Sequence, residues 1–223
     1  MIPLYDKNPR ESTPIVTWLL IGVNVLVYIM EISLSPAALD NLVENFALTP
    51  ATHYDNNSFL GLSLMPFFTS QFLHGGWMHL LGNMLFLFVF GDNVEERLGH
   101  FGFLVFYLFT GFVAGLLFCS FVPHSAIPTV GASGAISGVL GAYLMLYPRA
   151  GVLTFIPPFF VLTLPAWFFI GEWFVVQMIL ASTDVQMQAG VAWWAHVGGF
   201  VSGAMLRFIM AGPPPEAAAR QRL

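Results

Sequence analysis

One serine and one histidine in this sequence have the residue types and surroundings of a nucleophile and its base. Ser133 follows Gly131-Ala132 and begins an apolar segment that runs to about Tyr147. At about 1.5 Å per residue this segment makes a helix of roughly 22 Å, shorter than the ~30 Å hydrocarbon layer of a membrane. Ser133 is therefore predicted to start a helix below the membrane surface, beside a protein cavity that admits water. A histidine within hydrogen-bond distance, such as His196, would activate the Ser133 hydroxyl as a nucleophile.

The composition places the chain in a membrane. Of its 223 residues, 57% are hydrophobic and 9% are charged, and the mean hydropathy of +0.76 is too high for a water-soluble domain of this length. The single cysteine, Cys119, excludes an intrachain disulfide and argues against a cysteine-based metal cluster. The net charge of -5 includes no basic patch, so a nucleic-acid partner is not expected. Nothing in the sequence indicates a cofactor.

Six apolar segments divide the chain into predicted membrane spans. The polar stretch from Met1 to Thr13 lacks a signal-peptide cleavage site, so the first segment is expected to be retained. The apolar run from 152 to 181 is interrupted by prolines, and we expect an interfacial piece up to about Thr163 and then a span. The predicted fold class is an all-α polytopic membrane protein, a six-transmembrane-helix bundle forming a single domain over residues 1–223. The predicted spans are 15–32, 72–90, 101–121, 133–147, 164–181 and 191–210, followed by a short cytoplasmic tail at 211–223.

The basic residues predict an orientation for these spans. With six spans, every Lys and Arg falls on the same side as both termini, and the loops at 33–66, 122–130 and 182–190 contain none. By the positive-inside rule, both termini are predicted to be cytoplasmic. One span more or fewer would scatter these charges over both faces. The residues are Lys7, Arg10, Arg97, Arg149, Arg207, Arg220 and Arg222.

This topology brings four polar side chains to one leaflet. The spans at 72–90, 133–147 and 191–210 all run from outside to inside, so polar residues near their starts share one depth. His79 and Asn83 are four residues apart and lie on one helix face. Ser133 and His196 lie in the outer parts of their own helices. The four groups are therefore expected to converge near the outer side of the membrane.

Glycines would let two of these helices approach closely. One glycine stripe lies beside Ser133, and another shares the helix face of His196. Small residues permit close packing of membrane helices. Packing the two stripes together could bring the Ser133 hydroxyl within hydrogen-bond distance of the His196 ring, which nucleophilic catalysis requires. The glycines are Gly134, Gly138 and Gly141 on the first helix and Gly199 and Gly203 on the second.

Each of these observations also has a less specific explanation. A Gly-x-Ser-Gly string is common where small residues line a helix crossing, and the strand that precedes a nucleophile elbow is not predicted here. An intramembrane histidine or asparagine can hydrogen-bond across helices, although such residues mark functional sites by default because they are costly there. Glu172, a carboxylate predicted well inside a span, leaves open a small transporter with a relay of Glu172, His79 and Asn83. The shared depth of the four polar groups favours catalysis.

Three motifs, taken together, resemble the rhomboid family of intramembrane serine proteases. They are the segment from His74 to Asn83, the segment from Gly131 to Gly134, and the segment from Ala195 to Gly199, which match in order and spacing. The predicted cytoplasmic turn from Glu95 to Gly99 is also similar to the family's. The resemblance covers the whole six-span core.

The resemblance implies a serine endopeptidase that cleaves transmembrane segments of other membrane proteins near the outer face. It implies a Ser133–His196 catalytic dyad, with His79, Asn83 and the Ser133 backbone N–H stabilising the oxyanion. No carboxylate is placed to orient His196, so a dyad is expected rather than a triad. The expected location is the bacterial cell (inner) membrane, with the active site opening to the extracytoplasmic side. The glycines expected to support the site are Gly131, Gly134, Gly199 and Gly203.

Two positions depart from the family pattern. The family often has a Trp-Arg pair in the first outer loop, where this chain has Met65-Pro66, so that loop must be braced differently. Many members have a tyrosine four residues after the serine, stacked on the histidine, where this chain has Ser137. The His196 ring must therefore be held by other residues. His74 is off the His79 face and is expected to be structural.

The expected partners are transmembrane protein substrates and the lipid bilayer, and the oligomeric state is left open. A substrate helix would enter sideways past the span at 164–181, whose bulky residues suggest a movable wall. The alternative to an active protease is a catalytically inactive rhomboid-like protein that binds membrane helices. The wall residues are Phe168, Phe169, Trp173 and Phe174.

Overall fold

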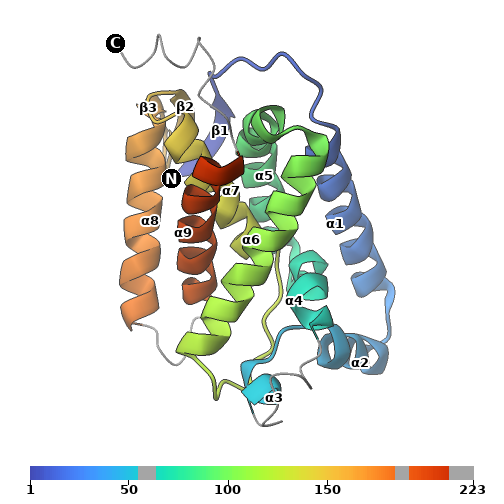
Figure 1. Ribbon diagram of the computed structural model, residues 1–223. Helices are drawn as coiled ribbons and strands as arrows, with labels where there is room; N and C mark the ends of the chain where they lie inside the picture. Colours follow the sequence, from blue (N-terminus) through green and yellow to red (C-terminus); the bar gives the residue numbers. More distant parts are fainter. Residues whose placement is uncertain (55–63, 184–190, 211–223) are drawn as a thin grey trace.

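The computed structural model describes residues 1–54, 64–183 and 191–210, and within these ranges helices dominate. Six helices stand side by side in one bundle (Figure 1), and a small sheet lies at one end of it. The predicted tail at 211–223 and most of the loop at 182–190 lie outside the described residues. The bundle helices are α1 (Ile15–Ser33), α5 (Trp77–Leu98), α6 (His100–Phe121), α7 (Ser133–Leu146), α8 (Ala166–Thr183) and α9 (Trp193–Met210).

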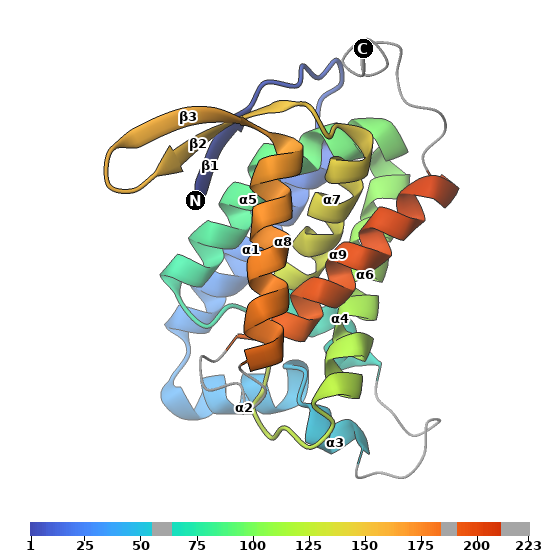
Figure 2. The same ribbon diagram turned by 90° about the vertical axis from the view of Figure 1, so that its left-hand side faces the viewer.

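Shorter elements connect α1 to α5. α2 (Pro36–Phe46) and α3 (Pro50–Tyr54) lie at the end of the bundle opposite the sheet (Figure 2). α4 (Met65–Thr69) and the 3-10 turn η1 (Ser70–Phe72) then lead into α5. Ser35 caps α2, because its hydroxyl accepts a hydrogen bond from the Ala38 N–H.

The helices identify a multi-pass membrane protein. α1, α6 and α8 are each long and apolar enough to cross a membrane. The α4–η1 segment and α5 make a fourth candidate span, with a bend of 94° between its two parts. α7 is an apolar helix of only 14 residues, about 21 Å long, as predicted for a helix too short to span alone. The count of six spans and the cytoplasmic side of both termini stay predictions.

The all-α prediction is wrong at the end of the bundle that carries the sheet. β1 (Ile2–Asp6), β2 (Gly151–Ile156) and β3 (Phe160–Pro165) form an antiparallel sheet in the order β1-β2-β3. The predicted interfacial piece up to Thr163 is thus a hairpin, and α8 begins at Ala166. Val, Ile, Thr and Phe residues on both sides of Pro157-Pro158 favour two short strands over a helix. β1 joins from far away in the sequence, a pairing that local pattern does not reveal.

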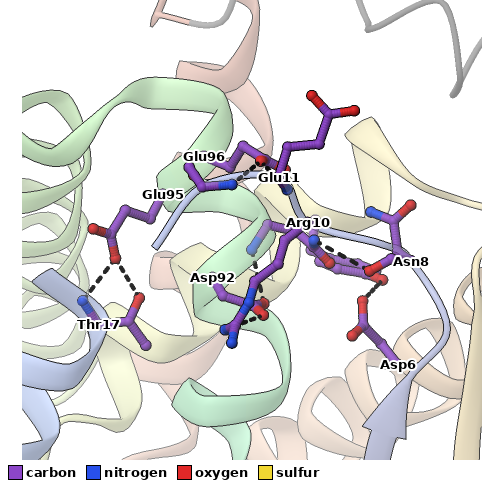
Figure 3. A network of polar contacts seen from close by, with 11 residues as sticks. Asp6, Asn8, Arg10, Glu11, Thr17, Asp92, Glu95 and Glu96 are labelled. Atoms are coloured by element: carbon purple, nitrogen blue, oxygen red, sulfur yellow. Dashed lines mark hydrogen bonds and ion pairs between the residues drawn. The ribbon is translucent and has the colours of Figure 1, made fainter. Parts of the chain in front are cut away.

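α5 continues eight residues past the predicted end at Phe90. Its last turns carry carboxylates that bind the start of α1, as Figure 3 shows. Glu95, which is 1% exposed, accepts hydrogen bonds from the N–H groups of Val16 (2.8 Å) and Thr17 (2.7 Å). These N–H groups have no partner within α1, and Pro14 has no capping side chain, so the carboxylate acts as a cap from another helix. The predicted turn from Glu95 to Gly99 is therefore helical up to Leu98, and Glu95 joins two helices.

α7 lies at the centre of the bundle, and 11 of its 14 residues are buried. Most of them are small or branched, which lets neighbouring helices pack closely on several sides. α7 and α9 both begin in the half of the bundle nearer α2 and run toward the end of the bundle that carries the sheet (Figures 1 and 2). The starts of these two helices therefore lie at a similar depth.

The sheet is attached to the end of α7 through Asp6. This residue is 4% exposed, and the Tyr143 hydroxyl donates a hydrogen bond to its Oδ2 at 2.6 Å. Burial disfavours the carboxylate and raises the pKa of Asp6 from 3.8 to about 7, and the nearby charge of Asp92 adds to the rise. Asp6 therefore keeps its proton in the folded protein at pH values where an unfolded chain has lost it.

This difference predicts a pH dependence of stability. Below pH 3.8 both states hold the proton; between pH 3.8 and about 7 only the folded state holds it, so the free energy of unfolding falls as pH rises. Asp6→Asn should remove this contribution to the decrease in the free energy of unfolding, which is on the order of a few kcal/mol. Unfolding in detergent micelles between pH 4 and pH 8 measures it. Equal pH slopes for wild type and variant would contradict the assignment.

Candidate active site

Ser133 and His196 meet at the starts of α7 and α9. The Ser133 Oγ lies 2.8 Å from Nε2 of His196, which is hydrogen-bond distance. The histidine is 9% exposed, and the serine is partly exposed. A hydroxyl that donates to a ring nitrogen in this way can lose its proton as it attacks, so the pair has the geometry of an activated nucleophile.

Glycine contacts between α7 and α9 produce this close approach. A Cβ added at Gly199 would overlap the carbonyl oxygen of Gly134, and one added at Gly203 would overlap the carbonyl oxygen of Gly138. The two helices thus touch backbone to backbone along the predicted stripes. A side chain at either α9 position would force the helices apart and separate Ser133 from its partner.

His79 and Asn83 face the same cavity as the serine and histidine. They lie one turn apart on α5, and all four residues line a cavity of about 630 Å³. The Asn83 amide donates a hydrogen bond to Nε2 of His74 at 3.0 Å, and the His74 and His79 rings meet edge to face at 5.1 Å. His74 thus orients the two groups of α5 that face the cavity.

Gly131 shapes the wall beside His79. Its φ of +126° is a conformation that L side chains rarely adopt, and an added Cβ would lie 2.6 Å from Cε1 of His79. The Gly131 N–H donates to the carbonyl of Ser70 at 2.8 Å, and this hydrogen bond fixes the segment before α7. Only glycine fits between this chain and the ring.

The start of α7 supplies a positive electrostatic potential at Ser133. The first intrahelical bond runs from the Ile136 N–H to the Ala132 carbonyl, and Ala132 has no capping side chain. The N–H groups of the first turn lack intrahelical acceptors, and the helix dipole is positive there. Negative charge that develops near Ser133 would be stabilised.

Gln177 is a site residue that the sequence analysis missed. Its Oε1 lies 2.7 Å from Nδ1 of His196, and its side chain is buried, with 6% exposed. The sequence predicts no carboxylate that could orient His196. It predicts the span at 164–181 only as a movable wall past which a substrate enters. The signal was available in the sequence, since Gln177 is a polar residue in an apolar span, one turn after Trp173.

Two tryptophans flank the His196 ring where the family pattern has a tyrosine. Trp173 lies 6.1 Å from it, tilted by 32°, and Trp193 lies 5.9 Å away, edge to face at 87°. Ser137, at the departing position, donates instead to the Ser133 carbonyl at 2.6 Å. The ring is therefore held from α8 and from the start of α9.

Other contacts brace the connection between α1 and α5, where Met65-Pro66 stand. The Glu31 carboxylate at the end of α1 accepts the N–H of His74, with oxygen distances of 3.3 Å and 3.2 Å. The Thr69 hydroxyl donates to the Phe46 carbonyl at 2.8 Å. These bonds tie this connection to α1 and α2. Glu31 was also missed, since it lies at the very end of its predicted span.

A second cavity opens from the site between α5, α7 and α8. Its volume is about 230 Å³, and it shares Met78, His79, Asn83, Ser133 and His196 with the first. Its apolar lining runs deeper into the bundle, whereas the first cavity is bordered by the loop at 128–130 and the start of α9. Its further lining residues are Gly82, Phe86, Ile136, Ser137, Leu140 and Trp173.

Glu172 does not join this site. Its side chain is exposed on the surface of α8, and it lines neither of the two cavities. The relay of Glu172, His79 and Asn83 considered from the sequence therefore has no geometric support.

The bundle and its partly buried Ser–His contact define the class as a multi-pass membrane protein with a polar site inside the helices. A family model of the Rhomboid domain matches residues 62–213, more than half of the chain. The chain therefore belongs to the rhomboid family. The matched region includes all four predicted site residues.

Relatives from several kinds of organism match parts of the chain. Rhomboid-like protein 11, chloroplastic, of Arabidopsis thaliana is 42% identical over 80 residues, 36% of this chain and 28% of that protein. Rhomboid protein 1, mitochondrial, of Saccharomyces cerevisiae is 33% identical over 144 residues, 61% of this chain and 39% of that protein. YdcA of Bacillus subtilis is 31% identical over 142 residues, 63% of this chain and 64% of that protein. The chain thus spans less than two thirds of the length of each.

Proposed function

We propose that this protein is an intramembrane serine endopeptidase that cleaves transmembrane segments of other membrane proteins with Ser133 and His196 as its catalytic dyad. The observation that carries the proposal is the 2.8 Å contact between Ser133 Oγ and His196 Nε2 at the start of a buried helix. Rhomboid family membership supports the same reaction class. A base within hydrogen-bond distance of a hydroxyl is the arrangement that activates a serine nucleophile.

The reaction proceeds through an acyl-enzyme. As the Ser133 Oγ attacks the carbonyl carbon of the scissile peptide bond, Nε2 of His196 takes the hydroxyl proton. The tetrahedral intermediate collapses, the C–N bond breaks, and His196 gives its proton to the leaving amine. Water then enters, loses a proton to His196, and attacks the ester. The second intermediate collapses, the bond between the carbonyl carbon and Oγ breaks, and His196 returns its proton to Ser133, which releases the new carboxyl terminus.

The oxyanion of each intermediate is stabilised by three sources of positive potential. The first-turn N–H groups of α7, including that of Ser133, lie beside the nucleophile. The side chains of His79 and Asn83 face the shared cavity from α5. Such donors stabilise charge that is present only in the transition state.

Asn83→Ala should lower kcat for peptide cleavage by about 10² to 10³, the usual cost of one oxyanion donor. Because Asn83 also donates to His74, His74→Ala is the matched control: it removes the same hydrogen bond and leaves the amide in the cavity. The account expects the asparagine variant to lose far more activity than the histidine variant at equal folded fraction. Equal losses would assign Asn83 a structural role only.

The substrate is a membrane helix whose backbone must unwind locally before the serine can attack it. Small or helix-breaking residues near its outer end lower that cost.

We propose that the substrate helix enters sideways past α8, into the second cavity. Phe86 of α5 and Phe169 of α8 have ring centroids 6.2 Å apart, so cysteines at these two positions, with Cys119 replaced by serine, face each other across the gap left by the rings, and a bifunctional thiol reagent can join the two helices. Cross-linking should block cleavage of a transmembrane substrate, and full turnover would exclude this route.

We propose six spans with both termini cytoplasmic, in the cell membrane of a bacterium, and a site that opens to the extracytoplasmic side. The described basic residues support the orientation, since they lie in the segment between β1 and α1, in the last turns of α5 and α9, and just after the end of α7. Of the three relatives named above, the bacterial one is matched over the largest share of its length. Labelling of single-cysteine variants in whole cells, with a thiol reagent that does not cross the membrane, tests this orientation. A cysteine at position 11 should be protected, and a cysteine at position 127 should react.

Cleavage of a reporter with one transmembrane segment, co-reconstituted in liposomes, tests the proposed function. The expected products are two fragments whose masses place the cut near the outer end of the segment. A folded protein that binds the segment and leaves it intact would identify the alternative, an inactive family member that binds membrane helices.

A further inference from the structure

We propose that Gln177 is a positioning residue: from α8 it fixes His196 in the tautomer that leaves Nε2 free to act as a base. This inference rests on the proposed serine chemistry. It assigns to the wall helix α8 a role in preparing the base, in addition to any role in substrate entry.

The hydrogen bond between the two side chains has only one chemically consistent direction. Gln177 Oε1 lies 2.7 Å from Nδ1 of His196, and an amide oxygen can only accept. Nδ1 of the neutral ring must therefore carry the proton, and Nε2 carries the lone pair. That lone pair faces the Ser133 hydroxyl at 2.8 Å, as a general base requires.

Burial makes this preference strong. Gln177 is 6% exposed and His196 is 9% exposed, so little water is present to replace the amide. Loss of the acceptor would leave a buried N–H without its partner, which is unfavourable and favours the opposite tautomer. In that tautomer Nε2 carries a proton and cannot accept one from Ser133. An amide in this role has a chemical precedent in the Cys-His-Asn proteases.

The same face of α8 also places an aromatic ring against the base. Trp173 precedes Gln177 by one turn and lies 6.1 Å from the His196 ring. α8 is held to α9 by the stacked rings of Phe174 and Phe200, with centroids 4.2 Å apart and an angle of 20°. Movement of α8 away from α9 would therefore withdraw the amide and the indole together. The base is oriented only while α8 is packed.

The test compares three variants on α8. Gln177→Leu removes the acceptor at similar size, Gln177→Glu keeps an acceptor oxygen, and Glu172→Gln makes the reverse change on the exposed side of the same helix. Nitrogen-15 NMR of histidine-labelled protein in nanodiscs reports the His196 tautomer, with the signal identified by its absence in His196→Ala. Wild type, Gln177→Glu and Glu172→Gln should show a proton held at Nδ1, and Gln177→Leu should show exchange between both tautomers.

The rate at which a fluorophosphonate modifies Ser133 is the second readout. Gln177→Leu should lower it about tenfold to a hundredfold, as loss of a partner that orients a histidine does elsewhere, and Gln177→Glu should restore most of it. Normal labelling and an unchanged tautomer in the leucine variant would overturn the inference. If the wild type itself is not labelled, the proposed protease chemistry fails, and the tautomer measurement alone then decides the role of Gln177.

A double-mutant cycle tests the connection to α8 packing. Phe174→Ala loosens α8 at a ring that stacks on Phe200. It should slow labelling severalfold in the wild-type background and have little effect once Gln177 is leucine, because the contact it acts through is already lost. Equal effects in both backgrounds would show that α8 packing does not act through Gln177.

Discussion

Ser133→Ala and His196→Ala are each expected to abolish proteolysis. Either change removes the nucleophile or the base that activates it, and losses in kcat on the order of 10⁴ to 10⁶ follow from removal of one member of such a unit. The double variant should be no worse than either single one, because the two groups act together. Cleavage of the liposome reporter, followed by quantitative mass spectrometry of the fragments, measures the loss.

A serine on another helix supplies the matched control. Ser120 lies exposed on α6, where its hydroxyl donates to the Leu116 carbonyl at 2.8 Å. Ser120→Ala should cleave the reporter at the wild-type rate. Retention of even a tenth of the activity in Ser133→Ala would mean that another residue is the nucleophile, and the proposed dyad would be wrong.

The second large effect is expected from Gly203→Val, two turns from the reacting atoms. A Cβ at Gly203 would overlap the backbone of Gly138, and backbone cannot rotate aside as a side chain can. We expect a loss of more than about 3 kcal/mol in the free energy of unfolding, at the upper end of overpacking effects. Any protein that folds should have Ser133 and His196 too far apart to react.

Gly171→Val on α8 is the control for this variant. A Cβ there meets no atom within 4 Å, so only the change in helix propensity remains; valine is a slightly better helix former than glycine, and the difference is less than about 1 kcal/mol. Thermal unfolding and fluorophosphonate labelling of both variants provide the comparison. Wild-type stability and labelling in Gly203→Val would contradict the close packing of α7 on α9.

Patterns local in the sequence predicted most of the helices. A helix occupies each of the six predicted segments, and the bounds of α1, α6 and α7 differ from the predicted spans by one residue at most. These elements are uniform apolar runs with clear ends, which hydropathy detects well. The prediction failed at α5, where the span was predicted to end at Phe90 and Glu95 was placed in a turn, although Glu95 lies in the helix and caps the neighbouring one.

Contacts between distant segments could not be predicted in this way. The pairing of β1 with β2 joins residues 2–6 to residues 152–155, and neither segment indicates its partner. The depth argument placed Ser133, His196, His79 and Asn83 near one another, because topology constrains depth. It could not predict which face of α8 lies against His196, so Gln177 was missed.

The departures from the family pattern are compensated by residues on other helices. The tyrosine that would stack on His196 is absent, and Gln177 and Trp173 of α8 hold the ring instead. The Trp-Arg pair of the first outer loop is absent, and Glu31 of α1 binds that loop. The same geometric requirement is thus met by different side chains, which a motif comparison alone does not show.

Modification of the purified protein by a fluorophosphonate, mapped by mass spectrometry of its peptides, tests the central claim most directly. The account predicts one adduct, on Ser133, that forms in wild type and does not form in His196→Ala. A folded, monodisperse protein in liposomes that shows no adduct on Ser133, or equal labelling without His196, would contradict an activated serine in this site.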